Sequence, residues 1–234
     1  MRLAIIIVTS NEQLHVKLLH TLLKLNAVVH NSKISCDMNF CDNDPVSRAT
    51  TFKNVLGGNY DKTVWLEDDT FIPFEDIVKT INDYNNEEFI TFCGMEKTVD
   101  WDQFKKYTKE ETVDTEPTNM RGIIPDINLN FNPKKSIPDM LPISRSGLCT
   151  FVMANKRVSR KLKGKFKNTT FHYTAKELNG KYLSAQENLC RMLREAGVQM
   201  KTMVDCDVVR YFKHEHPGRI LDTLDVMVRE RPAE

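Results

Sequence analysis

The sequence has almost no net charge, because 33 lysines and arginines are balanced by 32 aspartates and glutamates. It therefore lacks the global field that would attract nucleic acid, and we expect no nucleic-acid partner. Long hydrophobic runs are also missing. The apolar run at residues 3–8 is too short for a signal-peptide core or a transmembrane segment. We therefore expect a soluble cytoplasmic protein, in the host cytoplasm if the source is a virus.

The cysteines include no CxxC pair, so the pattern of a structural zinc site is absent. Most of them lie in apolar runs, which is typical of reduced, buried thiols in a reducing compartment. Cys36 and Cys41 are the only close pair, and a bridge or a metal site between them remains an alternative. The length of 234 residues fits one large α/β domain.

Hydrophobic periodicity predicts the order of the elements. Residues 3–8 form a β-branched run, typical of a strand buried on both faces. The pattern then predicts helices over 12–25, 46–56 and 74–84, and strands over 27–34, 63–66 and 88–93. This βαβαβαβ order is the signature of a mixed, mainly parallel sheet flanked by helices.

Residues 96–143 break this rhythm, because five of the nine prolines lie there. We expect an irregular lobe or lid, with a merely tolerated insertion as the alternative. Regular patterns return as strands over 147–153, 198–204 and 208–212, helices over 155–162 and 184–196, and a turn over 213–218. The single domain is thus divided into residues 1–95, 96–143 and 144–234.

Three acidic residues, Glu67, Asp68 and Asp69, directly follow the strand predicted at 63–66. Carboxylates repel each other and are costly to desolvate, so packing alone does not call for them. A divalent cation would remove the conflict. Hard oxygen ligands suit Mg²⁺ or Mn²⁺, and such an ion usually also holds a substrate phosphate. The cluster therefore predicts a Mn²⁺ or Mg²⁺ site.

Polar residues also follow the other predicted strands. In a parallel sheet, ligands bind outside the carboxyl ends of the strands. Thr9 and Asn11 follow the first strand, and Asp37 lies in the turn expected after the second. Arg48, on the first turn of the second helix, could reach the same crevice, although a surface salt bridge is its alternative. We expect this crevice to hold a nucleotide diphosphate.

Four segments together resemble the GT-A glycosyltransferases. Residues 5–11 resemble the first strand and donor-binding turn of that family, and residues 46–54 resemble its basic helix near the nucleotide. Residues 64–69 resemble its DxD motif, with Glu67 in the first place, and residues 147–153 its central strand at the sugar site. The resemblance covers most of the chain outside the 96–143 segment.

The resemblance implies a metal-dependent enzyme of GT-A fold. It would move a sugar from a nucleotide-diphosphate sugar, preferably uridine-linked, to a hydroxyl acceptor such as a glycan. Residues 1–95 would bind the donor, residues 96–143 would help to form the acceptor side, and residues 144–234 would complete the acceptor and catalytic half. The residues implied for the donor are Thr9, Asn11, Asp37, Arg48, Glu67 and Asp68, with Asp69 on the metal.

Two roles are implied for the later part of the chain. Glu187 stands where many inverting members place a general base, although the family's usual Glu-Asp pair is replaced by Glu187 and Asn188. Ser184 and Glu187 also form a capping box, so a helix cap is the alternative. His216, or His214, falls where several members hold a late metal-binding histidine, and an ordinary surface histidine is the alternative.

Three rival functions remain. A phosphatase of the haloacid-dehalogenase type would need an aspartate nucleophile where this chain has Glu67. The strand that carries this nucleophile would also normally be the first in the chain, whereas here it is the third. A nucleotidyltransferase would usually carry a glycine-rich, basic loop after its first strand, which residues 9–12 do not provide. A non-catalytic nucleotide-sugar-binding module on the same fold would bind the donor without turnover.

Overall fold

The computed structural model describes residues 1–10, 14–92, 95–99, 123–125, 127–129, 138–146, 150–166, 175–211 and 215–218. The elements are β1 (Arg2–Thr9), α1 (Val16–Asn31), β2 (Ser35–Asp42), α2 (Pro45–Gly57), β3 (Lys62–Glu67), β4 (Thr70–Phe71), α3 (Phe74–Asn82), β5 (Phe89–Thr91), β6 (Met95–Val99), β7 (Ile123–Pro125), β8 (Ile127–Leu129), β9 (Met140–Ser146), β10 (Phe151–Ala154), α5 (Asn155–Lys165), β11 (Lys176–Leu178), β12 (Lys181–Leu183), α6 (Ala185–Glu195), β13 (Met200–Met203), β14 (Val208–Tyr211) and β15 (Glu215–Gly218). None of the helices described here is long and apolar enough to cross a membrane.

An eight-stranded sheet in the order β2-β1-β3-β10-β5-β13-β9-β8 organises the fold. β2, β1 and β3 are mutually parallel, and β5 is parallel to β13. β10 runs antiparallel to both β3 and β5, and β9 runs antiparallel to both β13 and β8. The predicted mixed, mainly parallel α/β architecture is therefore confirmed, and the fold is Rossmann-like.

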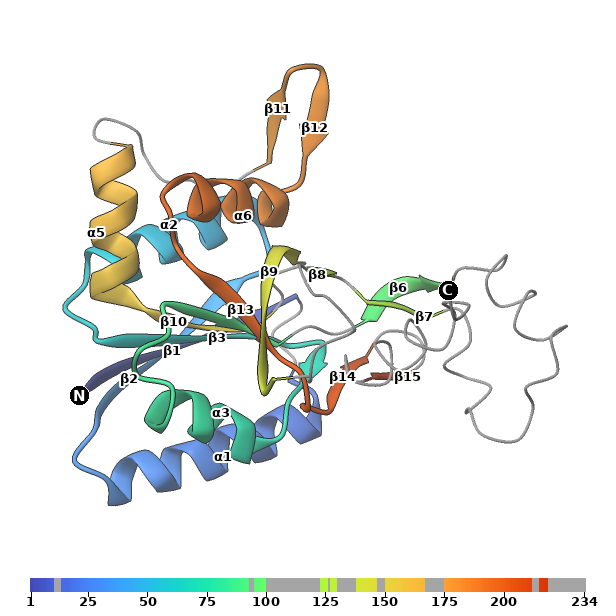
Figure 1. Cartoon of the computed structure of the whole chain (residues 1–234). Coiled ribbons are helices and arrows are strands. Elements are labelled where there is room, and N and C mark those ends of the chain that lie inside the picture. The colour runs from blue at the N-terminus through green and yellow to red at the C-terminus, as the bar shows by residue number, and fades with distance from the viewer. Residues whose placement is uncertain are drawn as a thin grey trace, which may run out of the picture.

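Helices cover both faces of this sheet. In Figure 1, α1 and α3 lie on one face, while α2, α5 and α6 lie on the other. Along β1 the side chains at positions 3, 5 and 7 pack into the α1–α3 core, and those at 4, 6 and 8 pack into the opposite core. All six side chains are buried, so β1 has the two buried faces that its β-branched sequence predicts.

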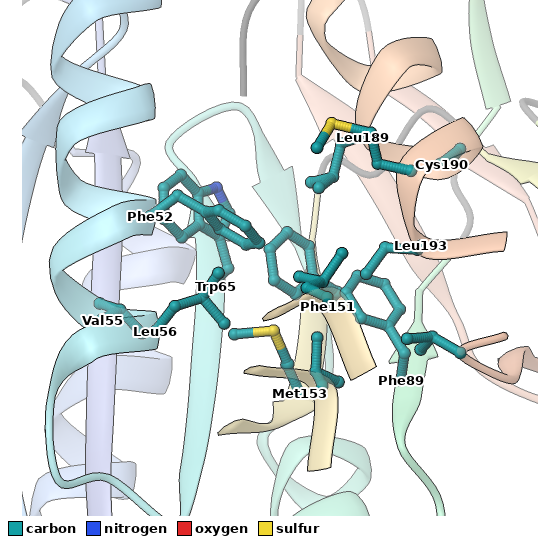
Figure 2. Close-up of a cluster of buried hydrophobic side chains, with 14 of the residues drawn as sticks. Phe52, Val55, Leu56, Trp65, Phe89, Phe151, Met153, Leu189, Cys190 and Leu193 are labelled. Atoms are coloured by element: carbon teal, nitrogen blue, oxygen red, sulfur yellow. The ribbon is translucent and has the colours of Figure 1, made fainter. Parts of the chain in front are cut away.

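The core beneath α2 and α6 is aromatic (Figure 2). Trp65 stacks on Phe151 with 5.6 Å between ring centroids, and Phe151 stacks on Phe89 at 4.7 Å. Phe52 of α2 meets the Trp65 ring edge-on at 6.2 Å. This continuous packing joins α2 to β3, β10 and β5. It fixes the middle of α2 against β3, whose end the acidic residues follow.

The strand predicted at 27–34 is wrong, because these residues mostly continue α1 to Asn31. Leu25 and Val29 extend the buried stripe of Leu18 and Leu22 at helical spacing, and this packing overrides the β-branched composition. The true second strand, β2, is rich in polar residues. Pairing with β1, from Arg2 opposite Ser35 onward, makes it a strand at the edge of the sheet.

Of the remaining predicted elements, some match the structure and others differ from it. The predicted helices at 46–56, 155–162 and 184–196 match α2, α5 and α6. Gly197 ends α6 with a φ of 72°, the left-handed conformation that favours glycine. Residues 215–218 form β15 and are not part of a turn, and the described residues of the 96–143 segment form short strands. The thiols of Cys36 and Cys41 are free, so no bridge joins them.

Candidate functional site

The ends of β1, β2 and β3 meet at one rim, which we call the carboxyl edge. The Asp68 amide donates to the carbonyl of Val8 at 2.9 Å, and the Asn43 amide donates to the carbonyl of Thr9 at 2.9 Å. The Ser10 amide donates to Oδ2 of Asp68 at 2.6 Å. These bonds continue the strand ladders beyond their last residues. They hold three loops in fixed positions at the edge where ligands bind in such sheets.

Asn43 and Asp44 organise the entry to α2. Asn43 Nδ2 donates to Ser10 Oγ at 2.8 Å, which ties the loop after β2 to the loop after β1. Asp44 is the N-cap of α2, and its Oδ1 accepts from the amides of Val46 and Ser47 at 2.8 and 3.0 Å. The hydrogen bonds from Ser47, side chain first, lower the pKa of the Asp44 carboxyl. The start of α2 is therefore locked against the edge.

Arg48 and Glu67 form a buried, bidentate ion pair. Arg48 Nη1 donates to Glu67 Oε1 at 2.7 Å, and Nη2 donates to Oε2 at 2.5 Å. Their side chains are only 8% and 7% exposed, so the pair is shielded from water. Arg48 also donates to Asn43 Oδ1 from Nε at 2.9 Å and from Nη2 at 2.6 Å. Burial raises the pKa of Glu67, and the hydrogen bonds from Arg48 oppose that rise.

The contacts of this pair bear on the roles predicted for both residues. Both Glu67 oxygens accept from Arg48, and Trp65 Nε1 adds a third bond to Oε1 at 3.3 Å. Direct contact with a donor, which we predicted for Arg48 and Glu67, would have to compete with these buried bonds. The pair joins α2, the Asn43 loop and the end of β3, and donor binding by either residue stays a prediction.

The two remaining acids occupy the turn between β3 and β4. Asp69 Oδ1 accepts from Thr70 Oγ1 at 2.8 Å, and its Oδ2 lies 3.8 Å from Nη2 of Arg210. The Asp69 side chain is 23% exposed, which makes it more accessible than Glu67. Asp68 and Asp69 are therefore the carboxylates that a ligand at the edge could reach.

His216 lies near this turn in the backbone register. Thr70 pairs with Arg210 between β4 and β14, and Arg210 pairs with His216 between β14 and β15. The three residues thus form one row across a small sheet that begins next to Asp69. His214 and Asn11 lie outside the described residues.

The predicted placement of Asp37 is wrong. The segment 35–37 begins β2 and does not follow it, because the preceding helix is longer than expected. Asp37 pairs in register with Ala4, near the start of β1, and its carboxylate binds Arg2 at 2.9 Å. It therefore lies at the opposite end of the strand from the acids. The hydrogen bond from Arg2 lowers the pKa of this exposed carboxyl.

The sequence placed Ser10 at the edge as part of the turn after the first strand, but it missed Asn43. One signal could have found Asn43. An aspartate before proline, as in Asp44 and Pro45, is a strong sign of a helix N-terminus. Placing α2 from that sign would have put the end of β2 at Asp42, and hence Asn43 at the edge.

Glu187 has the capping geometry that its sequence predicts. Its Oε2 accepts from the Ser184 amide at 2.9 Å, and its own amide donates to Ser184 Oγ at 3.2 Å. Both halves of the capping box are present, so the carboxylate stabilises the start of α6. The capping role of Glu187 is thus observed, and its catalytic role stays a prediction.

The oxygen ligands available at the turn between β3 and β4 can be compared with those that a divalent cation requires. Within the described ranges, no group of three or more His, Cys, Asp or Glu side chains is placed to hold a metal ion. Mg²⁺ and Mn²⁺ are often held by one or two carboxylates together with substrate phosphates. Asp68 and Asp69 fit that arrangement, whereas Glu67 is occupied by Arg48.

Comparisons with known proteins give no family. No family model matches the chain, and no curated protein is similar to it in sequence. The crystal structure of A197 from STIV has 13% identity and a TM-score of 0.48, over 91% of this chain and 86% of that one. The structure of 4-diphosphocytidyl-2C-methyl-D-erythritolsynthase from Anaerococcus prevotii DSM 20548 has 9% identity and a TM-score of 0.41, over 86% of this chain and 87% of that one. Neither likeness bears on the activity of this chain.

Proposed function

We propose that the chain is a metal-dependent glycosyltransferase, which moves a sugar from a nucleotide-diphosphate sugar to a hydroxyl acceptor. A uridine-linked donor is the preferred candidate. The observation that carries the proposal is the Asp68–Asp69 turn at the carboxyl edge, held by the Ser10 amide and backed by a buried ion pair. The turn places the Asp68 carboxylate beside the loop after β1, and Asp69 follows it next to Thr70 and Arg210. A nucleotide would lie at this edge of the sheet.

The residues of the carboxyl edge would have different roles in this reaction. Asp68 and Asp69 would hold Mn²⁺ or Mg²⁺ together with the donor diphosphate. When bound, this ion supplies charge neutralisation to the diphosphate that leaves. Arg48 and Glu67 keep the turn and the Asn43 loop in place, so that little reorganisation is needed during the reaction. Thr9 and Asn43 would line the nucleotide side.

Glu187 would accept the acceptor's hydroxyl proton if the reaction inverts configuration. Its Oε2 also accepts from the Ser184 amide at 2.9 Å, so the proposed base is the carboxylate that caps α6. A general base of this kind contributes a factor of about 10²–10⁴ to the rate.

Nucleotidyl transfer would use the same edge and the same cation, so the experiment must separate the two reactions. The protein is incubated with a panel of nucleotide sugars and, separately, with nucleoside triphosphates plus a sugar phosphate, with Mn²⁺ or with EDTA. Release of nucleoside diphosphate indicates glycosyl transfer, and release of pyrophosphate indicates nucleotidyl transfer. Metal-dependent donor binding without either product would favour the non-catalytic module.

Asp69→Asn tests the metal role, and Asp139→Asn, an exposed change on the segment before β9, is the matched control. We expect the first variant to lose metal-dependent turnover and donor-induced thermal stabilisation, while the control keeps both. Normal turnover in folded Asp69→Asn protein would remove the proposed metal site.

A further inference from the structure

Helix α5 concentrates positive charge in a chain that is almost neutral. Residues 155–165 include six cations and no carboxylate. Like charges three or four residues apart on a helix destabilise it by a few tenths of a kcal/mol per pair. Val158 and Leu162 are buried and account for the attachment of α5 to the core. Packing therefore explains the apolar side of the helix but not its charge.

Some of these cations have structural contacts. Arg157 Nη1 donates to the carbonyl of Asn86 at 2.8 Å, and Lys161 Nζ lies 2.7 Å from Glu88 Oε2. Lys156 forms an exposed ion pair with Asp61 at 2.6 Å.

Arg160 and Lys163 have no such contact. In the part of the chain that the structure describes, neither side chain makes an ion pair or a hydrogen bond. Both are exposed.

These two cations border a cavity of 480 Å³ between α5 and the end of α2, which we call the α2–α5 cavity. Its lining includes Gly57, Gly58, Lys156, Arg160 and Lys163. The three cations are spaced by four and three residues, so they share one face of the helix. Among the described residues, no carboxylate lines this cavity.

The end of α2 would normally oppose an anion, because a helix C-terminus carries partial negative charge. Here the carbonyls of residues 54–56 are already hydrogen-bonded. Asn155 Nδ2 donates to the carbonyl of Val55 at 3.0 Å, and Ser159 Oγ donates to that of Leu56 at 3.2 Å. The Gly58 amide donates to the carbonyl of Asn54 at 2.8 Å. The cavity is thus bordered by capped acceptors and by cations.

We propose that the α2–α5 cavity binds a phosphoryl anion, such as a phosphate monoester or a diphosphate group. Arg160 would supply paired donors to phosphate oxygens, while Lys163 adds a point charge. The cavity borders residues 57–59, which precede β3, whereas the acidic turn follows β3. It is therefore a second site at the opposite edge of the sheet, independent of the proposed transfer reaction. In Figure 1, α5 lies on the same side of the sheet as α2.

In the test, the full chain is titrated with pyrophosphate at constant ionic strength, and binding is measured by calorimetry. EDTA and the Asp69→Asn background remove binding at the acidic turn, so failure of the transfer proposal would not affect the result. The test variant is Arg160→Ala/Lys163→Ala. The control is Lys33→Ala/Lys165→Ala, which removes two exposed cations outside the cavity lining. Circular dichroism checks that each variant is folded, and alanine favours the helix.

We expect the test variant to bind pyrophosphate about tenfold more weakly or worse, the loss expected from two charge-assisted contacts, while the control binds like the parent. Flotation with vesicles containing phosphatidic acid gives the second arm. Capture that depends on Arg160 and Lys163 would identify a lipid headgroup as the source, and pyrophosphate binding without capture would identify a free phosphate ester. Equal binding by both variants in both arms, or none by the parent, would overturn the proposal.

Discussion

Arg48 on α2 and Glu67 at the end of β3 are joined by two hydrogen bonds of 2.7 and 2.5 Å, with both side chains almost fully buried. Removing one partner leaves the other charge buried without compensation, whereas removing both leaves a neutral site. The pair also holds the Asn43 loop through Arg48. It connects the stability of the fold to the shape of the carboxyl edge.

Arg48→Met should lower the free energy of unfolding by about 3–5 kcal/mol, because Glu67 would lose its counterion. Arg48→Met/Glu67→Met should be less destabilised than the sum of its two single variants, since it leaves no unpaired buried charge. Urea unfolding of the four proteins measures the coupling. Additive losses would show that the two side chains do not act as a pair.

Glu187 can be assigned by separating its two roles. Glu187→Gln keeps a side chain that completes a capping box, so stability should change by less than about 0.5 kcal/mol. If Glu187 is the base, transfer should fall by about 10²–10⁴-fold while donor binding is unchanged. Ser184→Ala is the complementary variant, and it should cost about 1 kcal/mol of stability through loss of the cap. Unchanged transfer in Glu187→Gln would exclude the base role.

Asn43 lies at the carboxyl edge, where the sequence had placed Asp37. Asn43→Ala removes the bonds to Ser10 and Arg48 at the edge, so donor-induced thermal stabilisation should fall. Asp37→Asn changes a carboxylate at the far end of β2, and donor response should stay at the wild-type level. A loss of donor response in Asp37→Asn, with none in Asn43→Ala, would contradict this geometry.

Lys62 gives a prediction about pH. Burial lowers its pKa to about 8, with Arg157 acting in the same direction and Asp83 against it. Its Nζ donates to the carbonyls of Thr80 and Ile81 at 3.1 and 2.6 Å, at the end of α3. Below pH 8 both folded and unfolded chains carry the charge, so its contribution to stability does not change with pH.

Between pH 8 and the unfolded value of 10.5, the folded chain loses this proton while the unfolded chain still holds it. The free energy of unfolding should therefore rise with pH in this window, by comparison with Lys62→Met. Parallel urea titrations at pH 7 and pH 9.5 give the difference directly. A difference between the two proteins that stays constant with pH would show that the pKa is not lowered.

The local elements were largely readable from the sequence. The run at residues 3–8 specifies a strand with two buried faces, and Ser184 with Glu187 specifies the start of α6. Both signals act between residues that are close along the chain. The error at residues 27–34 arose because β-branched residues occur in either element, and burial against the sheet decided for the helix.

The site was readable only in part. The sequence indicated that Thr9, Arg48 and the acids after β3 belong together, and the structure brings them to one edge. It did not indicate that Glu67 binds Arg48 and leaves Asp68 and Asp69 accessible. That outcome depends on the packing of Phe52 against Trp65, which sets α2 against β3.

The sequence by itself determined most of the helical segments, the buried first strand and the presence of acids after the third strand, because periodicity and capping are interactions between near neighbours. Tertiary structure alone decided that β10 enters the sheet antiparallel between β3 and β5. It also decided which acid is neutralised by a buried arginine. Both choices depend on contacts between residues distant in the chain, and such contacts exist only once the layers have packed.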